Sequence, residues 1–205
     1  MIGIIDYGMG NLLSVFHAVE ACGFDPKICR QPEELDEAER LILPGVGAFR
    51  DCLRNLTQTG FAQALDETVR RQGKPILGIC LGMQAMARRS FEGGEFQGLG
   101  WFEADVVRIT PADPSLRVPH IGWNQTPYRS DSPLFAGLPA APDFYFVHSY
   151  HLKCDQPDDV VATCDYGGPV TAAVARANIF ATQFHPEKSQ EHGLRVLGNF
   201  LRWKP

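Results

Sequence analysis

Short apolar runs alternate with amphipathic helical patterns along the first 100 residues of the chain. The apolar runs are typical of buried strands and lie at residues 1–6, 27–30, 40–43 and 75–79. Helical patterns lie at residues 12–22, after Pro32, in segments up to about residue 71, and at residues 81–89. Strands that alternate with helices in this way predict a parallel sheet whose crossover connections are helices.

The pattern after Gly100 changes to longer alternating runs. Strands are predicted at residues 102–109, 144–152 and 160–164, and a hairpin-like pair at residues 170–175 and 179–184. Ser189 can cap a final helix, whose inner face carries Leu194, Leu197 and Leu201. The sequence shows no repeat, low-complexity tract or linker, so residues 1–205 are predicted to form a single α/β domain.

Composition and charge narrow the class of protein. Hydrophobic residues make up 44% of the chain, enough for one sizeable core, and the net charge of −5 with scattered Lys and Arg argues against a nucleic-acid partner. The N-terminal apolar stretch lacks a basic leader and is interrupted by Asp6, so we expect no signal peptide or membrane span. The six cysteines show neither Cys-x-x-Cys spacing nor histidines at zinc-ligand spacing, which predicts no metal and a cytoplasmic location.

Cys80 is the best candidate for a nucleophile. It stands in Gly78-Ile79-Cys80-Leu81-Gly82, after a predicted strand and before a predicted helix. This is the cysteine counterpart of the Gly-x-Ser-x-Gly elbow, in which small residues on both sides allow a sharp turn that exposes the nucleophile. A helix N-terminus also favours the thiolate, which is the reactive form. The other five cysteines are predicted to be buried structural thiols.

His185 has the best setting for a general base among the six histidines: His17, His120, His148, His151, His185 and His192. It follows an apolar strand and precedes Pro186, which keeps the chain extended at His185. Glu187 then faces the same side as His185, because residues two apart in an extended segment do so. We expect Glu187 to orient the imidazole and stabilise its charged form.

Two backbone segments are candidates for the donors that stabilise an oxyanion. One is the N–H of Leu81, directly after the nucleophile, and the other is the loop Gly45-Val46-Gly47, which could also be a simple tight turn. Asp6, Pro44 and Cys80 all lie at predicted strand ends, where ligands collect in doubly wound sheets. Gln84 lies one helical turn after Cys80 and is expected to face the same crevice.

Six motifs together resemble the triad (class I) glutamine amidotransferases, and within them the glutaminase subunits of imidazole glycerol phosphate synthases of histidine biosynthesis. They span nearly the whole chain and lie at residues 6–12, 44–49, 78–84, 119–124, 148–150 and 185–189. The resemblance implies a flavodoxin-like α/β fold, with a mostly parallel sheet flanked by helices and antiparallel additions in the C-terminal half. The elbow and His-Pro-Glu are general to the class, whereas the other motifs are more discriminating.

The resemblance also assigns roles to individual residues. Cys80, His185 and Glu187 correspond to the catalytic triad, and Val46, Gly47 and Leu81 surround the oxyanion. Three further positions, Gln84, Ser149 and Tyr150, help to hold L-glutamine. The family positions that face a partner protein are Asn11, His120, Trp123 and Lys188, although Trp123 could instead be a core aromatic and Lys188 a solvated charge.

The resemblance further implies a heterodimer without a cofactor. The partner is a cyclase of (β/α)₈ barrel type, which uses the ammonia released from glutamine to form imidazole glycerol phosphate and aminoimidazole carboxamide ribotide. The chain lacks a nucleotide-binding Gly-x-x-x-x-Gly-Lys-Ser/Thr loop, so the acceptor site must lie on another subunit. Because an idle glutaminase wastes glutamine, we expect the loop at Val46 to adopt its active orientation only when the partner holds its acceptor.

Three alternatives remain at this point: a glutaminase of another synthase, an intracellular cysteine hydrolase, and an inactive binding subunit. Glutaminases for anthranilate or nucleotide synthesis usually have His where this chain has Met83. Those for pyridoxal phosphate synthesis usually have a Gly-Gly-Glu-Ser-like loop where this chain has residues 44–47. Peptidase-like relatives typically lack a Glu two residues after the histidine, and an inactive homologue would be expected to lose a triad member.

Overall fold

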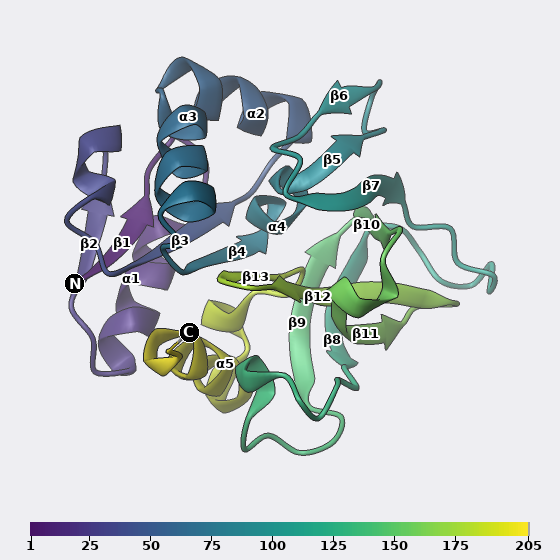
Figure 1. Cartoon of the computed structure of the whole chain (residues 1–205). Helices are drawn as coiled ribbons and strands as arrows, with labels where there is room; N and C mark the ends of the chain where they lie inside the picture. The colour runs from purple at the N-terminus through teal and green to yellow at the C-terminus, as the bar shows by residue number, and fades with distance from the viewer. Residues whose placement is uncertain (205) are drawn as a thin grey trace.

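A seven-stranded sheet runs through the centre of the computed structural model, which describes residues 1–204. Its strand order is β11-β12-β13-β4-β3-β1-β2 (Figure 1). The strands are β1 (Ile2–Ile5), β2 (Pro26–Cys29), β3 (Arg40–Gly45), β4 (Ile76–Cys80), β11 (Val160–Asp165), β12 (Pro169–Arg176) and β13 (Ile179–Thr182). The five strands from β2 to β13 are parallel, β12 pairs antiparallel with β13, and β11 pairs antiparallel with β12. The predicted mostly parallel sheet with C-terminal antiparallel additions is confirmed.

Helices cover both faces of this sheet. The α-helices are α1 (Leu12–Ala21), α2 (Phe49–Gln58), α3 (Phe61–Leu65), α4 (Leu81–Ala85) and α5 (Gln190–Arg202). The 3₁₀ turns are η1 (Pro32–Leu35), η3 (Pro133–Phe135), η4 (Pro157–Asp159) and η5 (Pro186–Lys188), and η2 (Asp66–Arg71) is a π-helix. Helices α2 and α3 lie on one face, and α1 and α5 on the other (Figure 1). The helix expected after Pro32 is thus a single 3₁₀ turn.

Two hydrophobic cores follow from these layers. Neighbouring residues of a strand point to opposite faces, and Ile5 accordingly packs with Phe49 of α2 while Ile4 packs with Val19 of α1. Because both faces are covered, the central strands are apolar along their whole length, which explains their continuous hydrophobic runs.

A second sheet, with the order β10-β7-β5-β6, packs beside the first. It consists of β5 (Ala87–Ser90), β6 (Phe96–Gln97), β7 (Phe102–Arg108) and β10 (Tyr150–Cys154). The predicted helix at residues 81–89 is therefore wrong beyond Ala85. Local helix propensity is overridden because residues 87–90 pair with β7 and β6.

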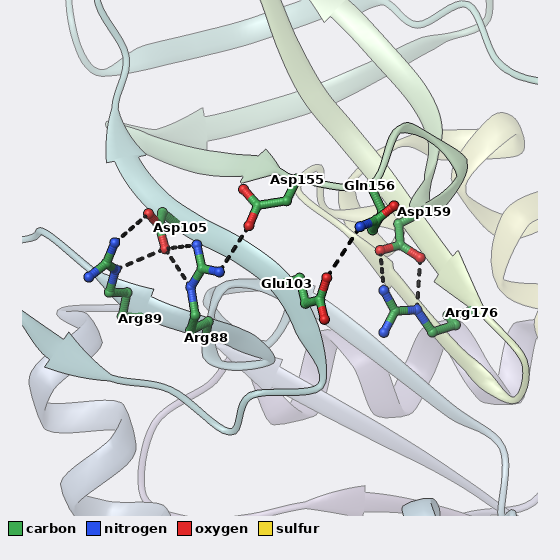
Figure 2. A network of polar contacts seen from close by, with 8 residues as sticks. All are labelled: Arg88, Arg89, Glu103, Asp105, Asp155, Gln156, Asp159 and Arg176. Carbon is green, nitrogen blue, oxygen red and sulfur yellow. Dashed lines mark hydrogen bonds and ion pairs between the residues drawn. The ribbon is translucent and has the colours of Figure 1, made fainter.

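Ion pairs hold β5 in that sheet. A bulge interrupts its pairing with β7 between Ala87 and Arg89, so the consecutive residues Arg88 and Arg89 both reach Asp105 of β7. Arg88 also contacts Asp155. Figure 2 shows these contacts together with a two-point contact between Arg176 and Asp159. These contacts connect segments far apart in the sequence.

The predicted strand at residues 144–152 is two strands rather than one. Strand β9 (Asp143–His148) pairs with β8 (His120–Gln125) in a separate ribbon, whereas β10 begins at Tyr150 and joins β7. Only Ser149 separates them. Hydrophobic alternation continues through the junction, so the sequence pattern does not mark the change of sheet.

Two further boundary predictions need correction. Strand β3 continues through Pro44 to Gly45, because those two residues still pair with β4 after the pairing with β1 has ended at Ile42. Proline is tolerated where a strand has a partner on one side only. Ser189 precedes α5 as expected, but its hydroxyl does not cap the helix; it donates to the carbonyl of His185 instead.

Within the described part of the chain, no helix is both long and apolar enough to cross a bilayer.

Candidate functional site

Cys80 sits at a strained turn between β4 and α4. Its φ of 55° and ψ of −108° are rare for a residue with a side chain, and such strain is concentrated at functional sites. A Cβ atom at Gly82 would collide with the backbone carbonyl of Leu43, so only glycine allows β3 to approach the turn. Gly78 has a similar role, since its Cβ would lie 2.8 Å from Met86 and 3.0 Å from the backbone of Gly82. The local geometry is that of a nucleophile elbow.

His185 and Glu187 form a buried pair beside this turn. The imidazole Nδ1 lies 2.7 Å from Glu187 Oε1, and the two side chains are 2% and 1% exposed. Burial by itself lowers the pKa of His185, but the interactions with Cys80 and with the Glu187 carboxylate outweigh burial and raise that pKa above its usual value. The other ring nitrogen, Nε2, is buried and has no hydrogen-bond partner among the described residues, which leaves it available to the thiol.

A cavity of about 240 Å³ opens over Cys80 and His185. Its size suits a small metabolite rather than a macromolecular ligand. Besides these two residues, the predicted positions that line it are Val46, Gly47, Leu81, Gln84, Tyr150 and Lys188. The lining residues that had no predicted role are Glu92, Val147 and His148. Ser149 lies next to the cavity in sequence but does not line it.

The loop after β3 forms part of the cavity wall. Gly45 pairs with Cys80, which brings residues 46 and 47 to the mouth of the nucleophile turn. Gly47 has a φ of +105°, which a residue with a side chain rarely adopts, so this glycine is required by backbone geometry. Val46 is 42% exposed despite its apolar side chain. The loop is therefore an accessible, glycine-dependent turn beside the nucleophile.

A second histidine in the cavity is chemically unlike His185. The Nδ1 of His148 donates to the carbonyl of Tyr150 at 2.8 Å, and its Nε2 accepts from Nδ1 of His120 at 3.0 Å. Burial lowers the pKa of His148 to about 3 and that of His120 to about 4. Both rings are thus neutral at pH 7, and neither nitrogen of His148 is free. Of the two histidines that line the cavity, only His185 can exchange a proton with Cys80.

A chain of hydrogen bonds runs from Tyr150 through Gln84 and Gln183 to the sulfur of Cys80. Gln84 Nε2 donates to the carbonyl of Tyr150 at 2.9 Å and to Gln183 Oε1 at 3.0 Å, and Gln183 Nε2 donates to Cys80 Sγ at 3.7 Å. Gln183 is not among the residues predicted from the sequence. A usable signal existed, because Gln183 and His185 are spaced two apart at the end of an apolar strand, where such residues share a face.

The residues expected at a partner surface fall into two groups. Trp123 and its neighbour Ile121 are 49% and 59% exposed on β8, so Trp123 is not a core aromatic. Lys188 is exposed at the rim of the cavity, and Asn11 is half-buried before α1. His120 does not fit the expectation: it is 2% exposed and is stacked between Tyr166 and Phe146.

A larger open hollow of about 610 Å³ lies beside Trp123 and is lined by Asp143 and residues 189–192. Among its side chains, the Ser189 hydroxyl is already bonded to the carbonyl of His185 and to the backbone N–H of Tyr145. The hollow therefore offers no activated nucleophile, and the smaller cavity over Cys80 is the candidate active site.

The other cysteines are structural by their environment. All six are free thiols. Burial raises the pKa of Cys29 to about 11 and those of Cys52, Cys154 and Cys164 to about 12, and it also raises the pKa of Cys22. Thiols of that kind are poor nucleophiles. Within residues 1–204, no group of three or more His, Cys, Asp or Glu side chains is arranged to hold a metal ion.

Comparison with known proteins gives a consistent result. Residues 3–203 match the family model "Glutamine amidotransferase class-I". The chain is 48% identical to "Imidazole glycerol phosphate synthase subunit HisH" of Mesorhizobium japonicum and 49% identical to the protein of that name from Rhizobium meliloti, covering 100% of this chain and 99% of each relative. A solved structure described as a glutamine amidotransferase superposes with a TM-score of 0.76 at 21% identity, covering 98% of this chain and 96% of the other.

Proposed function

Because the chain belongs to the class I glutamine amidotransferases, we propose that it is the glutaminase subunit of an imidazole glycerol phosphate synthase, acting in L-histidine biosynthesis. The observation that carries this proposal is the cavity in which Cys80, at a strained elbow, lies with the buried His185–Glu187 pair. The relatives' name supplies the biosynthetic context, and the geometry supplies the chemistry.

The first half of the reaction transfers the glutamyl group to Cys80. The Cys80 thiolate attacks the side-chain amide carbon of L-glutamine and forms a tetrahedral intermediate. Backbone N–H groups of Leu81 and of the loop at Val46 and Gly47, which line the cavity, are proposed to stabilise its oxyanion. His185 is held as imidazolium by the thiolate and by Glu187, so it is ready to protonate the leaving ammonia.

The second half regenerates the enzyme. Once ammonia has left, His185 is neutral and accepts a proton from water, which attacks the glutamyl thioester and releases L-glutamate. Glu187 accepts a hydrogen bond from Nδ1 of His185. The proton of the neutral ring therefore stays on Nδ1, and Nε2 is free to accept a proton. Gln84, Tyr150 and Ser149 are proposed to hold the substrate, and none of these steps needs a cofactor.

Ammonia must then reach an acceptor on another subunit. Released into water at neutral pH it would be protonated and lose its nucleophilicity, so a sheltered path is required. The proposed partner is the cyclase subunit, which forms imidazole glycerol phosphate and aminoimidazole carboxamide ribotide. Exposed Trp123 and Lys188, together with Asn11, are the proposed contacts, and the free thiols suit a cytoplasmic location of the heterodimer.

The direct test is to mix the chain with the histidine-pathway cyclase and its acceptor and to follow glutamate release from glutamine. Cys80→Ala is the matched control for non-enzymatic release. Release that the cyclase stimulates, and that Cys80→Ala abolishes, is the expected result. Undiminished release by Cys80→Ala would eliminate Cys80 as the nucleophile, and stimulation by a different synthase alone would redirect the biosynthetic assignment.

The loop at Val46 is proposed to be the point at which the partner controls the rate. Its accessibility and its glycine-dependent geometry allow the peptide between Val46 and Gly47 to change orientation without disturbing β3. The glutaminase should then be slow alone and faster with cyclase plus acceptor. Equal glutaminase rates in the two conditions would contradict this control.

A further inference from the structure

A buried amide lies behind the nucleophile and belongs to none of the groups assigned above. Gln183 follows β13, and its backbone N–H donates to the carbonyl of Ala172 on β12, which anchors the residue to the central sheet. The side chain is 0% exposed, so no solvent competes for its polar atoms. Burying an amide is unfavourable unless its groups are paired, so its partners indicate what it does.

Those partners are two side chains that line the cavity, Cys80 and Gln84. Gln183 Nε2 donates to Cys80 Sγ at 3.7 Å, while Gln183 Oε1 accepts from Gln84 Nε2 at 3.0 Å. Gln84 also donates from the same nitrogen to the carbonyl of Tyr150 at 2.9 Å. Because both N–H groups of Gln84 are occupied, only its carbonyl oxygen remains to meet a donor in the cavity.

From this geometry we infer that Gln183 is a positioning residue that fixes the Cys80 thiolate and the substrate-facing Gln84 at the same time. This inference rests on the proposed glutaminase function of the cavity. An N–H donor stabilises a thiolate more than a neutral thiol, so Gln183 favours the reactive form of Cys80. It also holds the sulfur in place, because the backbone of Gln183 is itself anchored to β12 of the central sheet.

Two substitutions of Gln183 separate the effect of its bond to Cys80 from the effect of its bond to Gln84. Gln183→Glu keeps the shape and an acceptor for Gln84 but replaces the donor to sulfur by an oxygen. Gln183→Met keeps the approximate length and removes both interactions. Gln63→Glu, on the exposed face of α3, is the matched control for adding one negative charge.

The first measurement is the rate of Cys80 alkylation by iodoacetamide as a function of pH, followed by mass spectrometry of the Cys80 peptide in the free chain. It requires neither glutamine nor a partner, so its result is independent of the proposed function. Both Gln183 variants should need a higher pH for half-maximal alkylation, by about one unit or more, whereas Gln63→Glu should match the wild type.

The second measurement is steady-state glutaminase activity with the cyclase and its acceptor. Gln183→Glu should lower kcat by about 10-fold or more with KM little changed, because Gln84 keeps its acceptor. Gln183→Met should lower kcat and also raise KM. Circular dichroism and thermal unfolding identify the variants that fold, and having two substitutions keeps the test decisive if one does not.

The inference is overturned if the folded variants give the wild-type alkylation profile and wild-type kcat. If instead the alkylation profiles shift as expected but no protein, wild type included, releases glutamate with any synthase, the role of Gln183 stands and the proposed function fails.

Discussion

His185 Nδ1 lies 2.7 Å from Oε1 of Glu187 in a pair that is almost completely buried. The carboxylate fixes the tautomer of the imidazole and stabilises the imidazolium that forms during the reaction. Replacing Glu187 by Gln keeps the shape but removes the charge. We expect kcat for glutamine hydrolysis to fall by about 10³- to 10⁴-fold, as for triad carboxylates in general, with the fold retained.

The control for this prediction is Glu67→Gln, which removes one exposed carboxylate on η2, away from the cavity. Its activity should equal that of the wild type in the same stopped assay of glutamate release. A Glu187→Gln enzyme with more than about a tenth of wild-type kcat would show that Glu187 is a structural partner of His185 only.

Gly82 is predicted to tolerate no side chain. A Cβ at this position meets the backbone carbonyl of Leu43, and a backbone atom cannot move aside as a flexible side chain can. Gly82→Ala should therefore lower the free energy of unfolding by about 3 kcal/mol or more, or prevent folding. Gly198→Ala is the contrast, because its Cβ meets only the mobile end of Arg202 and alanine favours helix α5 by up to about 1 kcal/mol. Chemical denaturation compares the two, and equal stabilities would refute the steric argument.

The parts of the site that could be predicted from sequence are those whose signals are local. The elbow around Cys80 and the His185-Pro186-Glu187 segment each lie within a few residues, where the geometry of a turn or an extended segment determines which side chains meet. The parallel pairing in the central sheet followed from the alternation of strands and helices, but the order of the strands within it did not. Family resemblance supplied the partner and the substrate, which no local pattern contains.

The parts that could not be predicted depend on pairings distant in sequence. His120 and His148 meet because β8 pairs with β9, and Gln183 meets Gln84 because β13 lies beside β4. Nothing in the run at residues 144–152 shows that it changes sheets at Ser149. Helix α4 stops at Ala85 for the same reason, since pairing with β7 outweighs the helix propensity of the following residues.

The buried histidine pair should make stability depend on pH. Burial lowers the pKa of His120 to about 4 and of His148 to about 3, whereas both are near 6.5 when unfolded. At a pH between the folded and the unfolded pKa values, the unfolded chain binds more protons than the folded one. Stability is therefore fully present above pH 6.5 and decreases as the pH falls toward 4, by up to roughly 1.4 kcal/mol per pH unit for each histidine.

His120→Phe tests this contribution, because phenylalanine can keep the stack between Tyr166 and Phe146 while removing one titrating ring. The slope of unfolding free energy against pH, from urea denaturation between pH 6.5 and 4.5, should become shallower by about 1 kcal/mol per unit. His17→Phe, at an exposed position, is the control and should keep the wild-type slope. Parallel curves for wild type and His120→Phe would mean that this pair does not couple folding to pH.

Trp123 is expected to contribute more to partner binding than to folding. Its ring is 49% exposed, beside the 59% exposed Ile121, and it touches Tyr145 only edge-on, so the fold gains little from it. Large aromatic residues that are exposed alone and buried in a complex commonly dominate binding energy. Trp123→Ala should raise the Kd for the cyclase by about 10- to 30-fold, measured by calorimetric titration, with an unchanged melting temperature. Phe91→Ala removes another exposed aromatic, which follows β5, and should leave the Kd unchanged; similar losses in both variants would mean that the face carrying β8 is not the cyclase-binding surface.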